Sequence, residues 1–215
     1  MTRKIDPSLI PAAPDLSFEH ALWKEGIIYV AGIDEAGRGS LAGPVTAAAV
    51  ILPQMEKVPV FFSAVQDSKQ LSTEAREWER KKIEENSLDW GVGYASNLEI
   101  DRYGIVPATR LAVRRALEEV KNQPQHLLVD YIVLPNNPLP QTRLVKGDAR
   151  SLSIAAASIL AKTHRDALMI TLAEKYPEYE LGTNKGYGTA AHREAIQRYG
   201  PSPLHRMSFA PMRSD

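Results

Sequence analysis

The chain has 215 residues, 44% of them apolar, with 26 Lys and Arg against 26 Asp and Glu. This length suits one domain, or one domain with a small appendage, and no apolar run is long enough to span a membrane. Cysteine is absent, which excludes disulfides, thiolate zinc sites and a cysteine nucleophile and fits a reducing cytoplasm. Residues 1–141 are net acidic and 142–215 net basic, which is either ordinary scatter or an acidic site beside a basic docking surface.

In chain order, residues 1–26 lack the features of a signal peptide; we expect them to form an extension, helix-like over 18–24, ahead of a catalytic domain at 27–215. Short apolar, β-branched runs predict strands at 27–31, 46–52, 90–95, 127–129 and 142–145. Charged or amphipathic segments predict helices at 72–86, 108–121, 149–175 and 189–199. Strands interspersed with helices indicate a mixed α/β domain.

Four carboxylates lie where predicted strands end or a helix begins. Asp34 and Glu35 directly follow the first strand, Asp130 follows the fourth, and Asp148 precedes the long helix. Acids at strand ends can converge at one edge of a sheet. Oxygen-rich sites suit Mg²⁺ or Mn²⁺, and two such ions can promote phosphodiester hydrolysis.

Each acid also has a purely structural explanation. Taken alone, Asp148 is better explained as the N-cap of the long helix, Asp130 as a turn cap, and the pair Asp34–Glu35 as a solvated loop. Neighbours in a strand point to opposite faces. Both members of the pair therefore reach one metal site only if the chain turns there, and the glycines that follow favour such a turn.

A glycine-rich loop follows these acids at residues 37–44. Its glycines allow close backbone approach to a ligand and expose N–H donors, and Arg38 is suited to bidentate contact with a phosphate. The alternative is a wide surface turn. The loop lacks the Gly-Lys-Ser/Thr ending of a phosphate-binding P-loop.

Several motifs, taken in order, resemble those of ribonuclease HII, the type 2 ribonuclease H family. They are GIDEAGRG at 32–39 with LAGPV at 41–45, DSKQL at 67–71, EID at 99–101, KGD at 146–148 with SIAAASILAK at 153–162, GYGT at 186–189, and YGP at 199–201 with HR at 205–206 and SF at 208–209. The resemblance spans about residues 28–209. Several long motifs in the right order are more specific than any one of them.

The resemblance implies a ribonuclease H-like fold, in which helices flank a mixed five-stranded sheet and the C-terminal part is helical. It implies an endonuclease that hydrolyses the RNA strand of RNA–DNA hybrids. The enzyme would also incise duplex DNA 5′ to embedded ribonucleotides, leaving 3′-hydroxyl and 5′-phosphate ends. Mn²⁺ or Mg²⁺, two ions during catalysis, would be the cofactor, and we expect a monomer with no membrane partner.

The resemblance also assigns site residues. It matches Asp34, Glu35, Asp130 and Asp148 to four metal-binding carboxylates, Gly37, Arg38 and Gly39 to the loop that contacts the ribose 2′-hydroxyl, Tyr187 to an aromatic residue that stacks at the RNA–DNA junction, and Lys69, Ser158 and Lys162 to phosphate contacts. The last two are spaced i,i+4 and share a helix face, which is otherwise explained as a solvated face. The 2′-hydroxyl distinguishes RNA from DNA.

Two residues depart from the family pattern. Ser40 stands where Pro is usual, and Tyr131 stands after Asp130 where Gly is common, which puts the placement of that acid in question. About 26 residues precede the first predicted strand, too few for the N-terminal domain of the related ribonuclease HIII. The five histidines lack metal-ligand spacing and are expected to be structural or surface groups.

Three other interpretations compete with the hybrid-cleaving enzyme. A metal nuclease of the same fold would act on a different nucleic acid, such as all-DNA duplexes. A binding module without catalysis would tolerate the loss of an acid. A structural domain whose acids only cap turns would bind no divalent cation.

Overall fold

The computed structural model describes residues 6, 10–60, 62, 65, 72–135 and 137–213. The DSKQL segment, with the predicted phosphate contact Lys69, lies outside the described residues.

Five strands form one mixed sheet in the order β3-β2-β1-β4-β5. β1 (Val30–Ala36) runs antiparallel to β2 (Val45–Ile51), and β2 runs antiparallel to β3 (Asp89–Ala95). β4 (His126–Asp130) is parallel to β1, and β5 (Gln141–Leu144) is parallel to β4. The predicted mixed five-stranded sheet is confirmed.

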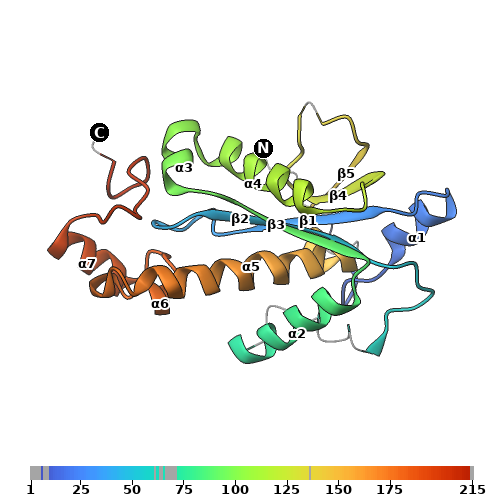
Figure 1. Cartoon of the computed structure of the whole chain (residues 1–215), viewed down its shortest axis with the longest axis horizontal. Coiled ribbons are helices and arrows are strands. Elements are labelled where there is room, and N and C mark those ends of the chain that lie inside the picture. Colours follow the sequence, from blue (N-terminus) through green and yellow to red (C-terminus); the bar gives the residue numbers. More distant parts are fainter. Residues whose placement is uncertain are drawn as a thin grey trace.

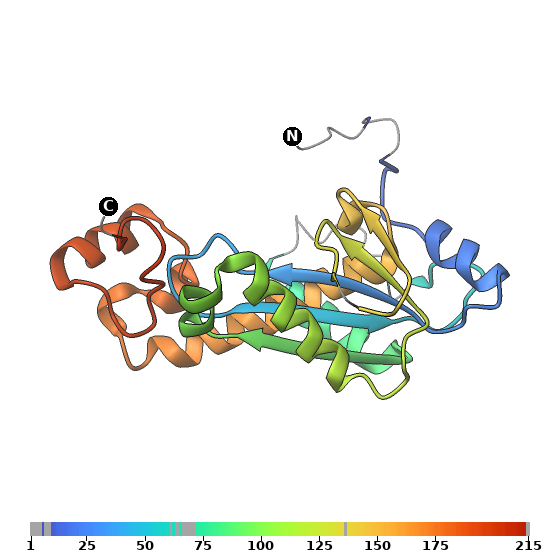
Figure 2. The ribbon, with the colours of Figure 1, turned by 90° about the horizontal axis from the view of Figure 1, so that it is seen from above.

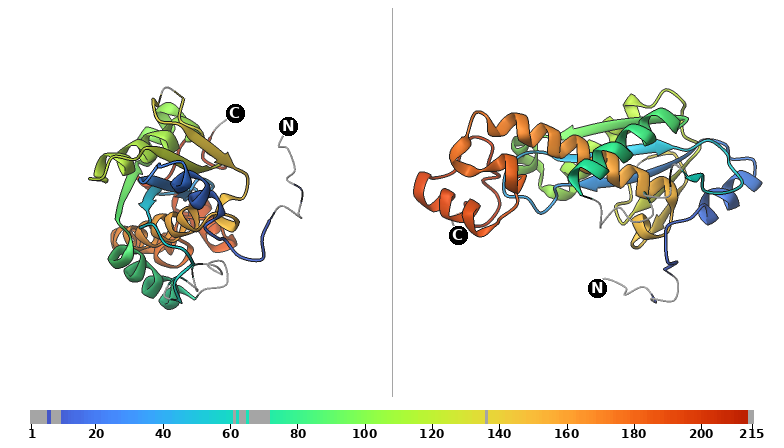
Figure 3. Two further views of the ribbon diagram at one scale, coloured as in Figure 1. Left: turned by 90° about the vertical axis from the view of Figure 1, so that its right-hand side faces the viewer. Right: turned by 90° about the horizontal axis from the view of Figure 1, so that it is seen from below.

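Helices cover both faces of the sheet (Figure 1). The elements are α1 (Ser17–Lys24), α2 (Thr73–Asn86), α3 (Asn97–Tyr103), α4 (Ile105–Glu119), η3 (Gly147–Ala149), α5 (Leu152–Ala173), η4 (Pro177–Tyr179), α6 (Leu181–Asn184) and α7 (Ala190–Tyr199). α4 lies over one face (Figure 2), whereas α5 runs along the other with α2 beside it (Figure 3). α1 lies at one end of the molecule and α7 at the other. No helix in the described part of the chain is long and apolar enough to cross a membrane.

Side chains of the central strands alternate between the two faces of the sheet, so each face has its own apolar cluster. Ala31 and Ile33 of β1 belong to the apolar cluster that includes α4, whereas Ala36 belongs to the cluster that includes α5. Successive strand residues point to opposite faces. Asp34 therefore lies on the α5 face and Glu35 on the α4 face.

Close approach of α5 to the sheet depends on a missing side chain. A Cβ placed on Gly32 of β1 would lie 2.2 Å from the carbonyl carbon of Ser153. Because interiors are packed at crystal-like density, backbone contact of this kind requires glycine. Gly32 thus brings α5, with Ser158 on it, close to the acidic strand.

Several predicted boundaries were wrong. β1 begins at Val30 and continues through the acids to Ala36, rather than ending at residue 31, because the antiparallel ladder with β2 extends to the pair Ala36↔Thr46. α3 was not predicted as a separate helix. Ser96 and Glu99 form a capping box at its start, and Gly104, with φ 82°, separates it from α4. The predicted N-cap Ser72 is confirmed, since its side chain accepts from the N–H of Ala75.

The predicted helix in the N-terminal segment is confirmed as α1, and a buried carboxylate fastens it to α5. Glu19 accepts hydrogen bonds from the hydroxyl of Ser151 at 2.6 Å and from the N–H and hydroxyl of Ser153 at 3.0 and 2.6 Å. Residues 17–24 are therefore packed against the sheet domain. The division of the chain at residue 26 stays a prediction.

Candidate active site

Three acids meet where the central parallel strands separate. The β1–β4 pairing ends at Ile33↔Val129, so the next residues, Asp34 and Asp130, lie at the open end between the strands. Asp34 accepts the N–H of Glu35 at 2.8 Å, and Asp130 accepts the N–H of Gly147 at 3.1 Å. Backbone donors thus orient two of the three carboxylates.

The electrostatics of these acids reflect burial and crowding. Burial raises the pKa of Asp34 well above its ordinary value, and the charges of Glu35 and Asp130 raise it further, while a hydrogen bond from Ser158 lowers it. The pKa of Glu35 is also raised, first by burial, although Arg38 opposes the rise. Acids held together in this way favour a positive counter-charge between them.

The predicted turn at Asp34–Glu35 was wrong. β1 keeps its regular register with β2 through both residues, and the first left-handed residue after them is Gly37, with φ 86°. The two acids leave opposite faces of one strand, yet the charge of Asp130 acts on both. The β1–β4 ladder ends at the pair just before them, so this edge of the sheet is open beside both acids.

Asp148 lies in η3, directly after the glycine whose N–H holds Asp130. The alternative role as N-cap of the long helix was wrong, because Ser151 caps α5 by accepting the N–H of Ile154 at 3.3 Å. Among the described residues, no group of three or more acidic or histidine side chains is arranged so that it could hold a metal ion. The structure places Asp34, Glu35 and Asp130 near enough for their charges to interact, and Asp148 stays a predicted ligand beside them.

The residue after Asp130 adopts an uncommon backbone conformation. Tyr131 has φ 60°, a left-handed conformation that glycine adopts readily and tyrosine rarely. Its N–H nevertheless bonds the carbonyl of Leu144 at 3.2 Å, and Asp130 keeps its register with that residue. The departure at Tyr131 leaves Asp130 in its strand.

Two buried arginines hold the glycine-rich loop by its carbonyl oxygens. Arg206 donates to Gly37 at 2.7 Å, Arg38 at 2.9 Å, Gly43 at 3.0 Å and Pro44 at 3.1 Å. Arg165 donates to Pro44 at 2.9 Å and to Ala42 at 3.2 Å. Both side chains are fully buried, and burial, with the charge of Arg165, lowers the pKa of Arg206 to about 9.

The arginine contacts decide which way the loop's amides point. Because a trans peptide directs its C=O and N–H in opposite directions, the carbonyls of Gly37 and Arg38 point toward Arg206 and the N–H groups of Arg38 and Gly39 point away from it. Gly37 itself must lack a side chain, since a Cβ would lie 1.9 Å from Nε of Arg165. Arg38 donates to Glu35 at 3.0 Å, which joins the loop to the acidic cluster.

Tyr187 lies in the turn between α6 and α7, with cations of α5 over its ring. Nζ of Lys162 is 5.3 Å and Cζ of Arg165 is 5.4 Å from the ring centroid, which is within cation–π range. Lys162 also donates to Asp166 at 2.7 Å. Gly186 accepts the N–H of Leu41 at 2.7 Å, so the Tyr187 turn and the glycine-rich loop are fastened together.

Sequence reasoning missed the structural importance of the arginines. Arg206 lies inside a matched motif, but the sequence does not show whether an arginine is exposed at the surface or buried. Arg165 lies in none of the motifs that were matched. A hydrogen bond from Ser158 lowers the pKa of Asp34, a role that its motif did not indicate, and its predicted phosphate contact stays a prediction.

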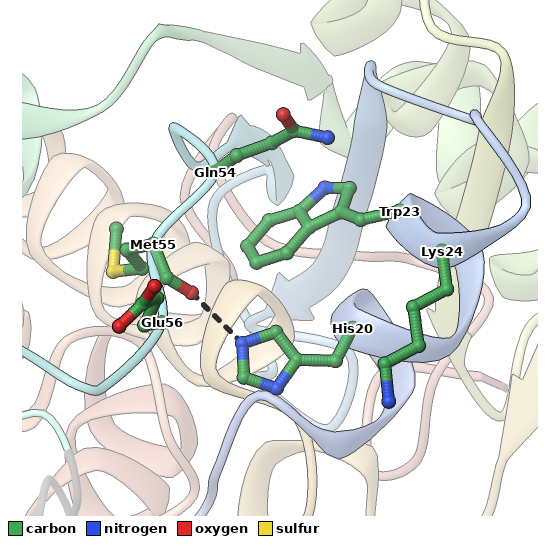
Figure 4. Close-up of a pocket in the computed structure, with 6 residues that line it drawn as sticks. All are labelled: His20, Trp23, Lys24, Gln54, Met55 and Glu56. Atoms are coloured by element: carbon green, nitrogen blue, oxygen red, sulfur yellow. Dashed lines mark hydrogen bonds between the residues drawn. The ribbon is translucent and has the colours of Figure 1, made fainter.

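A separate hollow of about 470 Å³ lies between α1 and the segment after β2 (Figure 4). His20 closes one side by donating from Nε2 to the carbonyl of Met55 at 2.8 Å, and the ring of Trp23 packs beside it. Of the predicted site residues that the structure describes, none lines this hollow. The candidate active site is therefore the acidic strand edge and not this cavity.

A mixed sheet in this order, with acids at the diverging ends of its central parallel strands, defines the ribonuclease H-like class of proteins. The family model for Ribonuclease HII matches residues 31–212. Ribonuclease HII of Chloroflexus aurantiacus is 52% identical over 93% of this chain and 94% of its own, and that of Dehalococcoides mccartyi is 50% identical over 95% and 98%. The chain belongs to the ribonuclease HII family, whose members are endoribonucleases.

Solved structures agree with this placement. The ribonuclease H2 of Pyrococcus horikoshii OT3 has a TM-score of 0.71 at 27% identity, covering 85% of this chain and 94% of that one. The ribonuclease HII of Archaeoglobus fulgidus, solved in complex with PCNA, has a TM-score of 0.71 at 25% identity, covering 87% and 98%. Bst-RNase HIII, solved with Mn²⁺, shares the fold with a TM-score of 0.66 at 22% identity, covering 99% and 73%.

Proposed function

We propose that this chain hydrolyses the RNA strand of RNA–DNA hybrids and incises duplex DNA 5′ to embedded ribonucleotides, leaving 3′-hydroxyl and 5′-phosphate ends. One observation carries the proposal. The acidic cluster of Asp34, Glu35 and Asp130 lies next to a loop whose backbone donors are held outward by Arg206. The first feature supports phosphodiester hydrolysis, and the second supports selection of a ribose.

The donor set fits divalent cations. We propose Asp34, Glu35, Asp130 and Asp148 as the ligands of Mn²⁺ or Mg²⁺, with two ions during catalysis. Burial and the charges of neighbouring acids raise the pKa values of Asp34 and Glu35, so a bound cation would stabilise their ionised forms. Mg²⁺ is usually held by one or two carboxylates, waters and substrate phosphates rather than by a closed protein cage, so an open set of acids supports completion of the site by the substrate.

The chain's own groups prepare the reaction. When bound, two such ions supply charge neutralisation and lower the pKa of water. The N–H groups of Glu35 and Gly147 and the hydroxyl of Ser158 hold Asp34 and Asp130 in place. An oxygen of water bonds to the scissile phosphorus while the P–O3′ bond breaks. The departing O3′ takes up a proton to become the 3′-hydroxyl, and the phosphate stays on the 5′ end of the ribonucleotide.

Selectivity for ribose follows from the loop. We propose that the N–H groups of Arg38 and Gly39 bond the 2′-hydroxyl, with Gly37 allowing the close approach. A deoxyribose offers no oxygen there, so the same donors gain no partner. This contact involves no base, in agreement with an enzyme that must act at any sequence.

The remaining predicted contacts complete the proposed substrate surface. We assign Tyr187 to stacking at the RNA–DNA junction and Lys69, Ser158 and Lys162 to backbone phosphates. The cations over the ring of Tyr187 support its proposed place beside a polyanion. We also propose a monomer, because all of these groups come from one chain, and a cytoplasmic location.

The test is incubation of duplex DNA that contains one ribonucleotide with Mg²⁺, with Mn²⁺ and with chelator, beside an all-DNA duplex of the same sequence. We expect one cut, 5′ to the ribonucleotide, in either metal and none in chelator or in the all-DNA duplex. Equal cutting of both duplexes would support a nuclease with a different substrate. A lack of incision in both metals would contradict the proposal.

A further inference from the structure

Two buried histidines form a hydrogen-bonded pair behind the Tyr187 turn. His192 of α7 and His205 of the C-terminal segment have 0% and 1% exposed surface. Their Nε2 atoms lie 3.0 Å apart, and Nδ1 of His192 lies 2.9 Å from the carbonyl oxygen of Tyr187. At the other end, the N–H of Ser202 donates to Nδ1 of His205 at 2.9 Å. The pair thus links the Tyr187 turn to the C-terminal segment at Ser202 and His205.

The two ends of this chain of bonds fix the protonation of both rings. A carbonyl oxygen accepts only, so Nδ1 of His192 must carry a hydrogen. A backbone N–H donates only, so Nδ1 of His205 must be bare. In two neutral rings the remaining hydrogen is then on Nε2 of His205, which donates to bare Nε2 of His192. All three bonds are satisfied at once, and a proton added to either ring would break one of them.

The pair holds the backbone that carries the Tyr187 ring. The N–H of Tyr187 donates to the carbonyl of Asn184 at 2.9 Å, and its carbonyl accepts from His192, so the peptides on both sides of this residue are fixed. His205 forms a backbone bridge with Ala42 of the glycine-rich loop. The pair thus adds to the bonds of Leu41 with Gly186 and of Thr189 with Tyr187, at 2.7 and 2.8 Å, that hold the ring of Tyr187 near the loop.

We infer that His192, backed by His205, is a positioning residue that sets the Tyr187 turn for substrate binding, and that the pair does so only with both rings neutral. The inference rests on the proposed function, in which Tyr187 contacts the nucleic acid. Neither histidine touches the acidic cluster or the substrate, so the expected effect is on affinity rather than on the chemical step.

The surroundings keep both rings neutral. Burial and the neighbouring His192 together lower the pKa of His205 to about 4; burial and the charge of Arg193 lower the pKa of His192. The ring of Tyr179 of η4 lies 4.9 Å from that of His205. The other titratable side chains on the elements packed against the pair are Glu178 of η4, Tyr187 of the turn, Arg193, Glu194, Arg198 and Tyr199 of α7, and Arg206 of the C-terminal segment. No carboxylate among them raises the pKa of either histidine.

Two matched variants separate the bonds of His192. In His192→Asn the amide nitrogen replaces Nδ1 and keeps the bond to Tyr187, whereas in His192→Gln the amide replaces Nε2 and keeps only the bond to His205. With the ribonucleotide-containing duplex we expect KM to rise only about twofold to threefold for the Asn variant, which keeps the bond to Tyr187 and loses the support of His205. For the Gln variant we expect KM raised about fivefold to tenfold, as for one lost hydrogen bond, with kcat changed less than about twofold. Equal KM values for the two variants would overturn the inference.

Tyr187→Ala distinguishes this inference from the proposed function. We expect Tyr187→Ala to raise KM, and His192→Gln to add nothing in that background, because it acts through the ring that is gone. An unchanged KM in Tyr187→Ala would refute the assigned role of Tyr187 itself. A raised KM in Tyr187→Ala with additive loss in the double variant would refute only the histidine link.

The tautomers can be measured in the unaltered protein, which avoids any failure of a variant to fold. Long-range ¹H–¹⁵N spectra of the imidazoles at pH 7 should show Nδ1–H for His192 and Nε2–H for His205, both neutral. An imidazolium in either ring at that pH, or the opposite tautomers, would overturn the inference.

Discussion

At the scale of single residues, Asp34 shows a conflict between stability and function. Its carboxylate is buried, accepts bonds from Glu35 and Ser158, and lies in the field of two other acids. A charge kept in such a place destabilises the metal-free fold, and sites of this kind are retained for binding or catalysis.

Asp34→Asn should therefore have opposite effects on activity and stability. It keeps the size of the side chain and removes the repelled charge, so the free energy of unfolding at pH 7 in chelator should rise by about 1 kcal/mol. Incision should fall by at least about a thousandfold. Urea unfolding and the incision assay measure the two effects. Incision at the wild-type rate would contradict the site assignment, and a loss of stability would contradict the repulsion.

Ser40 offers a second test at the residue scale. It is fully buried, and its hydroxyl has no hydrogen-bond partner in the described structure. An unpartnered buried hydroxyl is costly, and this position departs from the family's usual proline. Ser40→Ala should leave the protein as stable or raise the free energy of unfolding by up to about 1 kcal/mol, measured by urea unfolding. A clear loss of stability would show that the hydroxyl has a partner, such as a buried water.

At the scale of elements, the glycine-rich loop depends on Arg206. Arg206→Lys keeps the charge but replaces a planar fork of donors by one compact ammonium, so several loop carbonyls lose their partners. We expect the melting temperature to fall and preference for the ribonucleotide duplex over all-DNA duplex, measured as the ratio of affinities, to fall about tenfold. Arg38→Lys is the control for stability, because the side chain of Arg38 is 34% exposed. A melting temperature unchanged in Arg206→Lys would contradict the anchoring role.

The contact between β1 and α5 gives another element-scale prediction. Gly32→Ala would place a methyl group against the backbone of Ser153, where neither element can yield cheaply. We expect a loss of about 2–3 kcal/mol in the free energy of unfolding. Gly39→Ala, where a Cβ would meet nothing within 4 Å, is the matched control and should change stability by less than about 1 kcal/mol. Similar stabilities for the two variants would contradict the close approach.

Sequence patterns predicted the elements better than their ends. Apolar runs identified all five strands because periodicity and β-branching act locally. The extension of β1 through Asp34 and Glu35 was not predictable, since it depends on pairing with β2. The start of α5 was misplaced because a short 3₁₀ turn and a serine cap at Ser151 precede it.

The sequence predicted the carboxylates of the candidate site, but it did not predict the buried arginines and histidines that hold the neighbouring loop and turn. Their places at strand ends predicted that Asp34 and Asp130 would lie near each other, and their charges do interact. It could not show that Arg165 and Arg206 turn inward, or that two histidines meet, because these contacts join segments far apart in the chain. Burial of a charged side chain is a property of the assembled fold.

At the scale of the whole molecule, the buried histidine pair should shape acid stability. The folded pKa of His205 is about 4, below the ordinary value of about 6.5. As pH falls below about 6.5, His205 takes up a proton in the unfolded chain but not in the folded protein. The folded state therefore loses stability progressively as pH falls from about 6.5 to about 4, the folded pKa of His205. The loss attributable to this group is up to about 3 kcal/mol.

The test compares how steeply the free energy of unfolding changes with pH in the wild type and in His205→Asn. Protonation of Asp34 and Glu35, whose pKa values are raised, opposes the effect in both proteins and cancels in the difference. Wild type should lose more stability than the variant between about pH 6.5 and 4. Equal slopes would show that His205 titrates normally in the folded protein.

The parallel pairing of β1 with β4 also has a kinetic consequence. The strands that carry Asp34 and Asp130 are joined through β2, β3 and the helices α2, α3 and α4, and such long-range pairings form late because a long loop must first close. A partly folded chain, even one with its helices formed, therefore lacks the acidic cluster. During refolding, incision activity should therefore recover more slowly than the helical circular-dichroism signal. Activity would then appear only in molecules in which β1 and β4 have paired.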